Sequence, residues 1–309
     1  MWMREPGKVV DRLVFLGTHD NCLYLVRGKE AMIIGGGMSW TAPALERQFS
    51  TMDLESHKLR YLVVLHSHFD HCGAVPYLKR KFPQMQVVAS AHAGKMFAKE
   101  KVVNFIAQAN KQMIDRLGLQ GEYERLNLRF DGVQVERAVA EKDIIDLGDG
   151  IEVHFLETPG HTQCSIAAYV PKFKALFPSD AAAPPTDDAN EVFYPGPQYD
   201  FSLYKESLEK LATYEIEICA FEHYGVVIGD RARKILHQGL SQTEAFKDRI
   251  VEVYRETGDL DETVHRVAAE TLKSGNFDFM EAEFQITILK VVVRNVLRYA
   301  ELLGEAPAP

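Results

Sequence analysis

The stretch Tyr61-Leu-Val-Val-Leu-His-Ser-His-Phe-Asp-His-Cys-Gly73 passes from an apolar run directly into three histidines and an aspartate. A short apolar run bounded by polar residues is typical of a buried strand. His66, His68, Asp70 and His71 then lie on the loop leaving its C-terminal end, which is where α/β sheets place their ligand sites. The stretch therefore predicts a strand that leads into a metal site.

The residue types in this loop are those that borderline metal ions select. Imidazole nitrogen and carboxylate oxygen bind zinc, iron and manganese alike, so the ligand types leave the identity of the metal open. His66 and His68, two apart in an extended loop, point the same way and can hold one ion. Asp70 and His71, after the chain turns, can face a second. The alternative interpretation is a solvated histidine-rich loop, which needs no partners elsewhere in the chain.

Further candidate ligands do occur downstream, and each follows a predicted strand. They are His161 after the alternating segment 151–156 and a Pro-Gly turn, Asp180 after a hairpin formed by 165–170 and 174–177, and His223 after 216–221. The repeated placement of metal-binding side chains at strand ends favours the metal site over the solvated loop.

In this chain order the candidate residues resemble the metallo-β-lactamase-fold superfamily of binuclear metal hydrolases. The matching pattern is His66-x-His68-x-Asp70-His71, then His161 after Thr-Pro-Gly, then Asp180 and His223. The resemblance implies an α/β fold, an αββα sandwich with two divalent metal ions at one edge of its sheets. It also implies the ligand sets: His66, His68 and His161 for one ion, Asp70, His71 and His223 for the other, and Asp180 as the bridge.

A looser resemblance extends over nearly the full length, to the quinolone-signal response thioesterases, whose C-terminal helices cover the metal site. The similar features are the segment from Asp70 to Leu78, a helical insertion after Ala91, and the pattern Asp278-Phe-Met-Glu-Ala-Glu283 before a long amphipathic helix. This resemblance implies thioesterase activity and a C-terminal helical cap.

Two departures from the superfamily pattern concern the surroundings of the metal. Many members end an early strand with Asp-x-Gly, whose carboxylate supports a metal ligand, whereas this chain has Ile33-Ile-Gly-Gly-Gly37. Gly35 has no side chain that could do this. Because losing such a carboxylate typically costs about 10–100-fold in metal affinity, either another acid substitutes or the site binds metal more weakly. Glu222-His223-Tyr224-Gly225 also replaces the commoner Gly-His-Gly, and Tyr224 places a bulky aromatic ring beside a ligand.

Length and composition fit a catalytic domain with a helical extension. With 309 residues, 46% of them hydrophobic, the chain can bury a sizeable core. We expect the sandwich over residues 1–229 and a C-terminal helical cap over 230–309. Apolar residues at helical spacing and turn signals at 257–259 and 274–276 predict the cap helices at 231–256, 260–273 and 279–303, with a frayed tail at 305–309. The apolar faces of these helices, and of a helical stretch from His92 to Leu117, leave a homodimer open.

Charge and hydropathy restrict the partners. The net charge of −9 argues against a nucleic-acid partner, because such binding depends on clustered Lys and Arg. The dense basic cluster Lys79-Arg80-Lys81 ends a predicted helix, where it favours the helix dipole. Alternatively this cluster, or Lys95, Lys99 and Lys101, meets the phosphates of a coenzyme A thioester. No segment has the apolar length of a membrane span or signal peptide, and four cysteines lack C-x-x-C spacing, so we expect a cytoplasmic protein with no membrane partner.

Residues and resemblance together predict a binuclear metal-dependent hydrolase of a small-molecule acyl substrate. A metal-bridging water would lose a proton near neutral pH, since bound divalent metal lowers the pKa of water from 15.7 towards about 7. The hydroxide would cleave a thioester, ester or lactone, and Asp70 is the catalytic candidate that orients it and moves its proton. Two alternatives stay open. One is a di-iron oxidoreductase, although those relatives carry Glu where this chain has His68, and the other is a regulatory or partner-binding protein with a slow metal site.

Overall fold

The computed structural model describes residues 1–52, 55–188, 191–272 and 280–304. The chain divides into two compact units. Unit 1 comprises Met1–Glu157, Cys164–Ser179 and Glu215–Arg233, and unit 2 comprises Thr158–Gln163, Asp180–Tyr214 and Lys234–Pro309. The predicted domain boundary between 229 and 230 stays a prediction. The predicted turn at 274–276, the predicted helix start at Phe279 and the tail at 305–309 lie outside the described residues.

Unit 1 contains two seven-stranded sheets, so the predicted α/β class with a two-sheet sandwich is confirmed. Most neighbouring strands are antiparallel, but β5 to β8 run parallel to one another and β12 is parallel to β13. The first sheet has the order β2 (Gly7–Val10), β3 (Leu13–Gly17), β4 (Cys22–Arg27), β5 (Ala31–Ile34), β6 (Leu59–Val63), β7 (Gln86–Ser90) and β8 (Arg137–Val139). The second has the order β1 (Trp2–Met3), β14 (Val226–Ile228), β13 (Ile218–Ala220), β12 (Ala175–Phe177), β11 (Ile166–Val170), β10 (Glu152–Glu157) and β9 (Ile144–Asp146).

The core of unit 1 is formed by side chains from both sheets. Tyr24 of β4, Phe155 of β10 and Phe177 of β12 are fully buried in one cluster, and the rings of Tyr24 and Phe177 meet edge to face at 5.3 Å. Burying a side chain of this size stabilises the fold by roughly 1.5–3 kcal/mol. The strands predicted at 151–156, 165–170 and 174–177 are confirmed, and the last two form the expected antiparallel hairpin.

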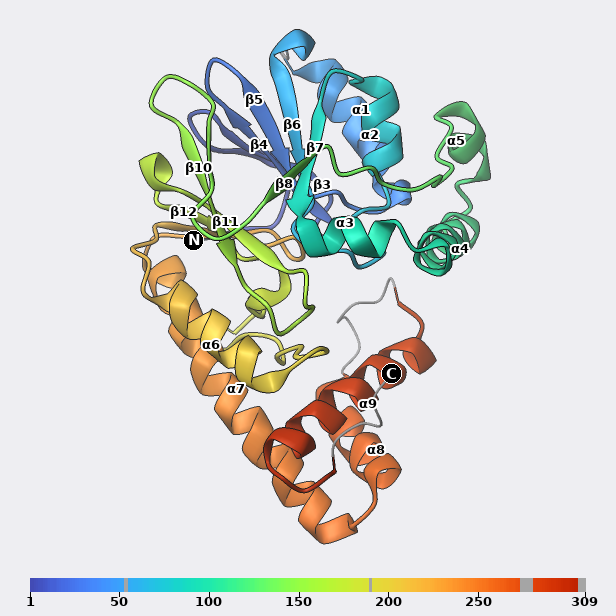
Figure 1. The fold of residues 1–309 in the computed structure, drawn as a ribbon, viewed down its shortest axis with the longest axis vertical. Coiled ribbons are helices and arrows are strands. Elements are labelled where there is room, and N and C mark those ends of the chain that lie inside the picture. Colours follow the sequence, from blue (N-terminus) through green and yellow to red (C-terminus); the bar gives the residue numbers. More distant parts are fainter. Residues whose placement is uncertain (53–54, 189–190, 273–279, 305–309) are drawn as a thin grey trace. The chain divides into compact units, whose positions relative to one another are not determined.

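Helices complete unit 1, and α1 and α2 lie beside the sheet that contains β3 to β7 (Figure 1). The helical stretch predicted from His92 to Leu117 is wrong in one detail, because it is two helices. Ser90 caps the first by accepting from the Ala93 amide, and extended backbone at Lys99 (φ −86°, ψ 116°) separates it from the second. The helices are α1 (Ala42–Thr51), α2 (Val75–Lys81), α3 (Ala91–Phe97), α4 (Glu100–Arg116) and α5 (Gln120–Arg125).

Unit 2 is helical around its own apolar cluster, which confirms the predicted C-terminal helical region. Asp259 caps one helix by accepting from the Glu262 amide, and Gly258 (φ +64°) makes the turn before it. Across the described residues, no helix has the length and hydropathy to cross a membrane. The helices are α6 (Phe201–Ala212), α7 (Asp230–Thr257), which starts in unit 1, α8 (Leu260–Thr271) and α9 (Ala282–Tyr299).

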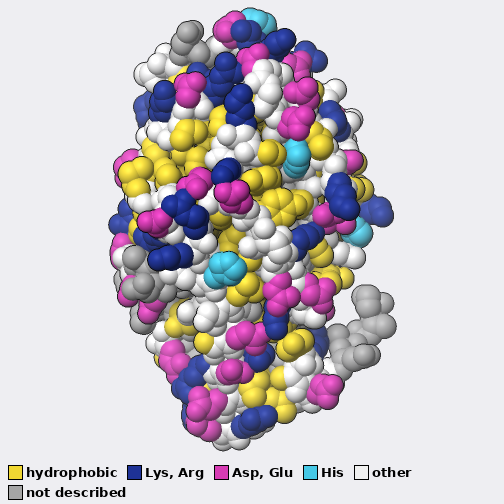
Figure 2. Space-filling model, turned by 90° about the vertical axis from the view of Figure 1, so that its left-hand side faces the viewer, with side chains coloured by type: hydrophobic (Ala, Val, Ile, Leu, Met, Phe, Trp, Pro, Cys, Tyr) yellow, Lys and Arg dark blue, Asp and Glu magenta, His cyan; other side chains and the backbone are white. Residues whose placement is uncertain are grey.

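The basic cluster at the end of α2 is paired with acidic side chains. Lys79 lies 2.9 Å from Glu136, Arg80 lies 3.5 Å from Asp131, and Lys81 lies 2.8 Å from Glu46. Basic and acidic side chains are likewise interspersed on the face drawn in Figure 2. These pairings favour a structural role for the cluster over phosphate binding.

Candidate metal centre

The loop after β6 carries the four candidate ligands that are closest in sequence. β6 lies between β5 and β7, with parallel pairing on both sides, so the loop leaves the C-terminal edge of this part of the sheet. His66, Asp70 and His71 are buried, whereas His68 is partly exposed. The chain turns between His68 and His71, whose amide donates to the His68 carbonyl at 3.1 Å. The predicted strand and ligand loop are therefore present.

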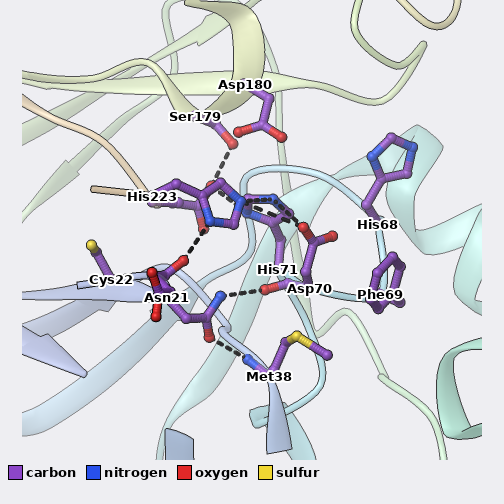
Figure 3. Close-up of polar contacts among 12 residues, drawn as sticks. Asn21, Cys22, Met38, His68, Phe69, Asp70, His71, Ser179, Asp180 and His223 are labelled. Carbon is purple, nitrogen blue, oxygen red and sulfur yellow. Dashed lines mark hydrogen bonds and ion pairs between the residues drawn. The ribbon is translucent and has the colours of Figure 1, made fainter. Parts of the chain in front are cut away.

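Asp70, His71 and His223 converge within unit 1 (Figure 3). Nε2 of His71 lies 3.1 Å from Nε2 of His223. Oδ2 of Asp70 lies 3.5 Å from His71 Nε2 and 3.4 Å from His223 Nε2. Zinc bonds to nitrogen and oxygen are about 2.0–2.1 Å, which puts neighbouring tetrahedral ligands about 3.3 Å apart. The three atoms thus have the chemistry and spacing of ligands to one divalent ion.

The other ring nitrogens of these histidines face protein acceptors. His223 Nδ1 lies 2.6 Å from the Asp20 carbonyl oxygen, and His71 Nδ1 lies 3.0 Å from Glu222 Oε2. An acceptor at Nδ1 keeps the proton on that nitrogen and leaves the Nε2 lone pair for a metal. Both rings are therefore oriented for coordination through Nε2.

His66 and His68 lie beside this cluster in unit 1. The ring of His66 is 4.1 Å from that of His71 and 4.8 Å from that of His68. His66 Nδ1 lies 3.0 Å from the hydroxyl oxygen of Ser179, so Nε2 is again the nitrogen suited to a metal. Unit 1 thus gathers five of the candidate ligands.

The remaining candidates, His161 and Asp180, lie together in unit 2. His161 Nε2 is 3.3 Å from Asp180 Oδ2, and His161 Nδ1 is 2.7 Å from the Gly196 carbonyl oxygen. Gly160 (φ +133°) makes the turn before His161, and a Cβ there would lie 2.2 Å from the backbone of Tyr204. Only glycine lets α6 approach this turn so closely. That the pair joins the ligands of unit 1 stays a prediction.

Asp70 is held ionised by its neighbours. Burial by itself raises the pKa of this carboxyl, but the His71 and His223 imidazoles outweigh burial and bring the pKa well below its ordinary value. The Asn21 amide also donates to the Asp70 carbonyl at 2.9 Å (Figure 3). The carboxylate is therefore negatively charged at neutral pH, and Asn21 anchors the main chain of the same residue.

Sequence reasoning missed two polar residues beside the ligands, Ser179 and Glu222. Both are buried, and Ser179 donates to the Glu222 carboxylate. The available signals were the missing acid at Gly35 and the unusual Glu before His223, but nothing in the local pattern connects them.

Tyr224 packs its buried ring against His19, with centroids 5.2 Å apart.

The two sheets, with histidine and aspartate ligands at their strand ends, define a metal-binding α/β sandwich. The model of the Metallo-beta-lactamase superfamily matches residues 17–223, so this chain belongs to that superfamily. The metallo-beta-lactamase fold-containing protein of Sulfurisphaera tokodaii is 28% identical over 198 residues, covering 63% of this chain and 70% of that protein. A hydroxyacylglutathione hydrolase of Rhodopseudomonas palustris is 28% identical over 161 residues, covering 52% of this chain and 48%, about half, of that enzyme.

Solved structures share the fold at low sequence identity. A metallo-beta-lactamase family protein of Thermus thermophilus superposes with a TM-score of 0.67 and 15% identity, covering 97% of each chain. The archaeal superfamily protein of Sulfolobus tokodaii superposes with a TM-score of 0.56 and 20% identity, covering 93% of this chain and 98% of that one. These likenesses establish the architecture alone.

Proposed function

We propose that this protein is a binuclear metal-dependent hydrolase that cleaves a thioester, ester or lactone of a small acyl substrate. The observation that carries the proposal is the convergence of Asp70 Oδ2 with the Nε2 atoms of His71 and His223 at 3.1–3.5 Å. Membership of the metallo-β-lactamase superfamily supports it.

The proposed ligand sets follow the superfamily pattern. His71 and His223 join Asp70 around one ion, and their ring orientations support this assignment. The other ion would be held by His66, His68 and His161, and Asp180 would contribute its carboxylate to both ions. Support for the second set comes from the Nδ1 contacts of His66 and His161, which leave Nε2 of each ring for the metal.

The bound ions would supply a water acidified to near-neutral pKa and polarisation of the substrate carbonyl. Asp70 contributes an ionised carboxylate with Oδ2 directed at His71 and His223. Its other oxygen would accept a hydrogen bond from the attacking water, orient that water and take up its proton. The imidazoles and carboxylates keep the reacting groups in a fixed arrangement inside a buried site, where electrostatic stabilisation is strong.

A thioester is the substrate class that we favour. One relative is named for hydrolysis of hydroxyacylglutathione, which is a thioester. Phe69, between two candidate ligands, is buried and forms an edge-to-face pair with Phe105 of α4, a residue that is 49% exposed. The exposed part of Phe105 would offer an apolar surface to an acyl group. Coenzyme A is one candidate leaving group.

Metal analysis and an activity panel test the proposal. Protein purified without added metal is analysed for bound metals and assayed against acyl-coenzyme A and acylglutathione thioesters, aryl esters and lactones. The proposal expects two metals per chain and turnover that is lost on chelation and restored by metal. Oxygen consumption with an electron donor, without hydrolysis, would instead indicate a di-iron oxidoreductase. Two metals without turnover of any kind would favour a regulatory protein.

A further inference from the structure

Glu222 is a buried carboxylate next to a candidate ligand but outside the ligand sets. It directly precedes His223, and only 2% of its surface is exposed. Its backbone carbonyl accepts from the Cys22 amide at 2.7 Å, which ties the end of β13 to the start of β4. A buried carboxylate is costly unless hydrogen-bond donors surround it, so its partners indicate what it does.

Two polar groups border this carboxylate, the ring of a candidate ligand histidine and a serine hydroxyl. Glu222 Oε2 lies 3.0 Å from His71 Nδ1, an ion-pair distance, and it accepts a hydrogen bond from the Ser179 hydroxyl. The Ser179 oxygen lies 3.0 Å from His66 Nδ1. Because a serine hydroxyl has one proton, and here gives it to the carboxylate, its oxygen is left to accept from His66. One carboxylate therefore reaches two imidazoles, one directly and one through a hydroxyl.

These contacts determine which ring nitrogen of His66 and of His71 carries the proton. A neutral imidazole has one N–H, so a proton held at Nδ1 leaves the lone pair on Nε2. In His71, Nε2 is the atom that lies 3.1 Å from His223 Nε2 and 3.5 Å from Asp70. The carboxylate thus selects the tautomer that can coordinate a metal.

The same carboxylate lies where position 35 has no side chain. A Cβ at Gly35 would be 3.2 Å from Glu222 Oε1, and Gly35 has φ +97°, a conformation that side chains disfavour. Glu222 follows β13 of the second sheet, and its carboxylate lies beside Gly35, which follows β5 of the first sheet. The first sheet has no acidic side chain at that position.

We propose that Glu222 is the positioning residue of the metal centre and orients His71 directly and His66 through Ser179. The inference rests on the proposed function, because it requires His66 and His71 to bind metal. These two histidines belong to different ions in the proposed ligand sets. Loss of the carboxylate therefore weakens the binding of both ions, whereas loss of the Ser179 hydroxyl weakens the binding of only the ion held by His66.

Stepwise metal titration tests this prediction. Zinc affinities are measured by chelator competition, and cobalt(II) absorption spectra are recorded, for the wild type, Glu222→Gln and Ser179→Ala. Glutamine keeps the size but turns one acceptor oxygen into an NH₂ donor. We expect both affinities to fall by about 10–100-fold in Glu222→Gln and one affinity to fall in Ser179→Ala. The matched control is Glu46→Gln, which removes a carboxylate that pairs with Tyr77 and Lys81 and keeps both affinities.

The outcomes separate this inference from the proposed function. A wild type that binds no metal overturns the proposed function. A wild type that binds two ions, with unchanged affinities and cobalt spectra in both variants, overturns the role of Glu222 alone. A purely structural role would lower the melting temperature of the metal-free variants without changing their affinities, and also counts against the inference. If Glu222→Gln does not fold, Ser179→Ala is the deciding variant. Affinities for both ions that are unchanged from the wild type would then contradict the orientation of His66 through Ser179.

Discussion

Asn21 and Asn110 hold adjacent carbonyls of the ligand loop. Asn21 Nδ2 donates to the Asp70 carbonyl at 2.9 Å, and Asn110 Nδ2 donates to the Phe69 carbonyl at 3.1 Å. Their amide oxygens accept from neighbouring backbone N–H groups, those of Met38 at 2.6 Å and Ser39 at 2.7 Å. Two consecutive residues of the loop are thus tied to two consecutive residues of the segment after β5.

Replacing Asn110 should loosen this attachment. Asn110→Leu leaves the Phe69 carbonyl and the Ser39 amide without their buried partner, and each such loss costs about 1–3 kcal/mol. We expect a fall of about 2–6 kcal/mol in the free energy of unfolding, measured by urea denaturation. The control is Asn104→Ala at an exposed position of the same helix, which should stay within about 0.5 kcal/mol of the wild type. Equal stability of the two variants would contradict the attachment.

Gly73 is required by the same amide. A Cβ at Gly73 would lie 2.1 Å from Asn110 Oδ1, so Gly73→Ala must displace the Asn110 side chain. We expect a loss of about 1–3 kcal/mol from overpacking, together with weaker metal binding by the loop. Gly121→Ala is the comparison, since a Cβ there meets no atom of the described residues within 4 Å. The prediction fails if Gly73→Ala matches Gly121→Ala in thermal melting and metal content.

Asp180→Ala and His68→Ala test the proposed ligand sets. Loss of a bridging carboxylate or of an imidazole ligand should remove metal and hydrolytic activity together, because charge and coordination are lost at once. Metal per chain and turnover are measured on the same preparations, with His154→Ala, which lies on β10 beside Glu152, as the control. Two retained metals and full turnover in Asp180→Ala would falsify the bridging role.

Glu46 should contribute a small, pH-dependent stabilisation. Hydrogen bonds from Lys81 and then from Tyr77 lower the pKa of its carboxyl below the ordinary 4.5. This stabilisation is complete above pH 4.5 and is lost as the pH falls through the lowered pKa. Lys81→Met should therefore cost about 0.2–1 kcal/mol at pH 7, and the difference from wild type should shrink as the pH falls through the lowered pKa. Urea midpoints measured from pH 7 downwards provide the measurement, and a difference that does not shrink on acidification would contradict it.

The parts of the fold that sequence predicts are those with local patterns. The apolar run before His66 predicts β6, and the helical spacing after 230 predicts α7 and α8, because strand and helix periodicities are written into neighbouring residues. The candidate ligands are recognisable because histidine and aspartate at strand ends have few other uses. The break between α3 and α4 at Lys99 carries no glycine or proline at that position, so local pattern gave no warning of it.

The surroundings of the ligands were not predictable in this way. The carboxylate beside His71 comes from Glu222, whereas the position that lacks an acid is Gly35. These positions come together only when the first and second sheets pack. The sequence does not indicate the role of Ser179 either, because a serine before an aspartate is common in turns. Contacts of this kind depend on tertiary packing, which periodicity and residue type do not encode.

The Nδ1 contacts differ in how evolution or engineering can alter them. His223 faces the main-chain oxygen of Asp20, which every amino acid at that position would provide, so its orientation is insulated from point mutation. His71 and His66 rely on side chains instead. Substitutions of Glu222 and Ser179 would therefore change how His71 and His66 are oriented while leaving the candidate ligands intact, and a directed library at these two positions would explore this.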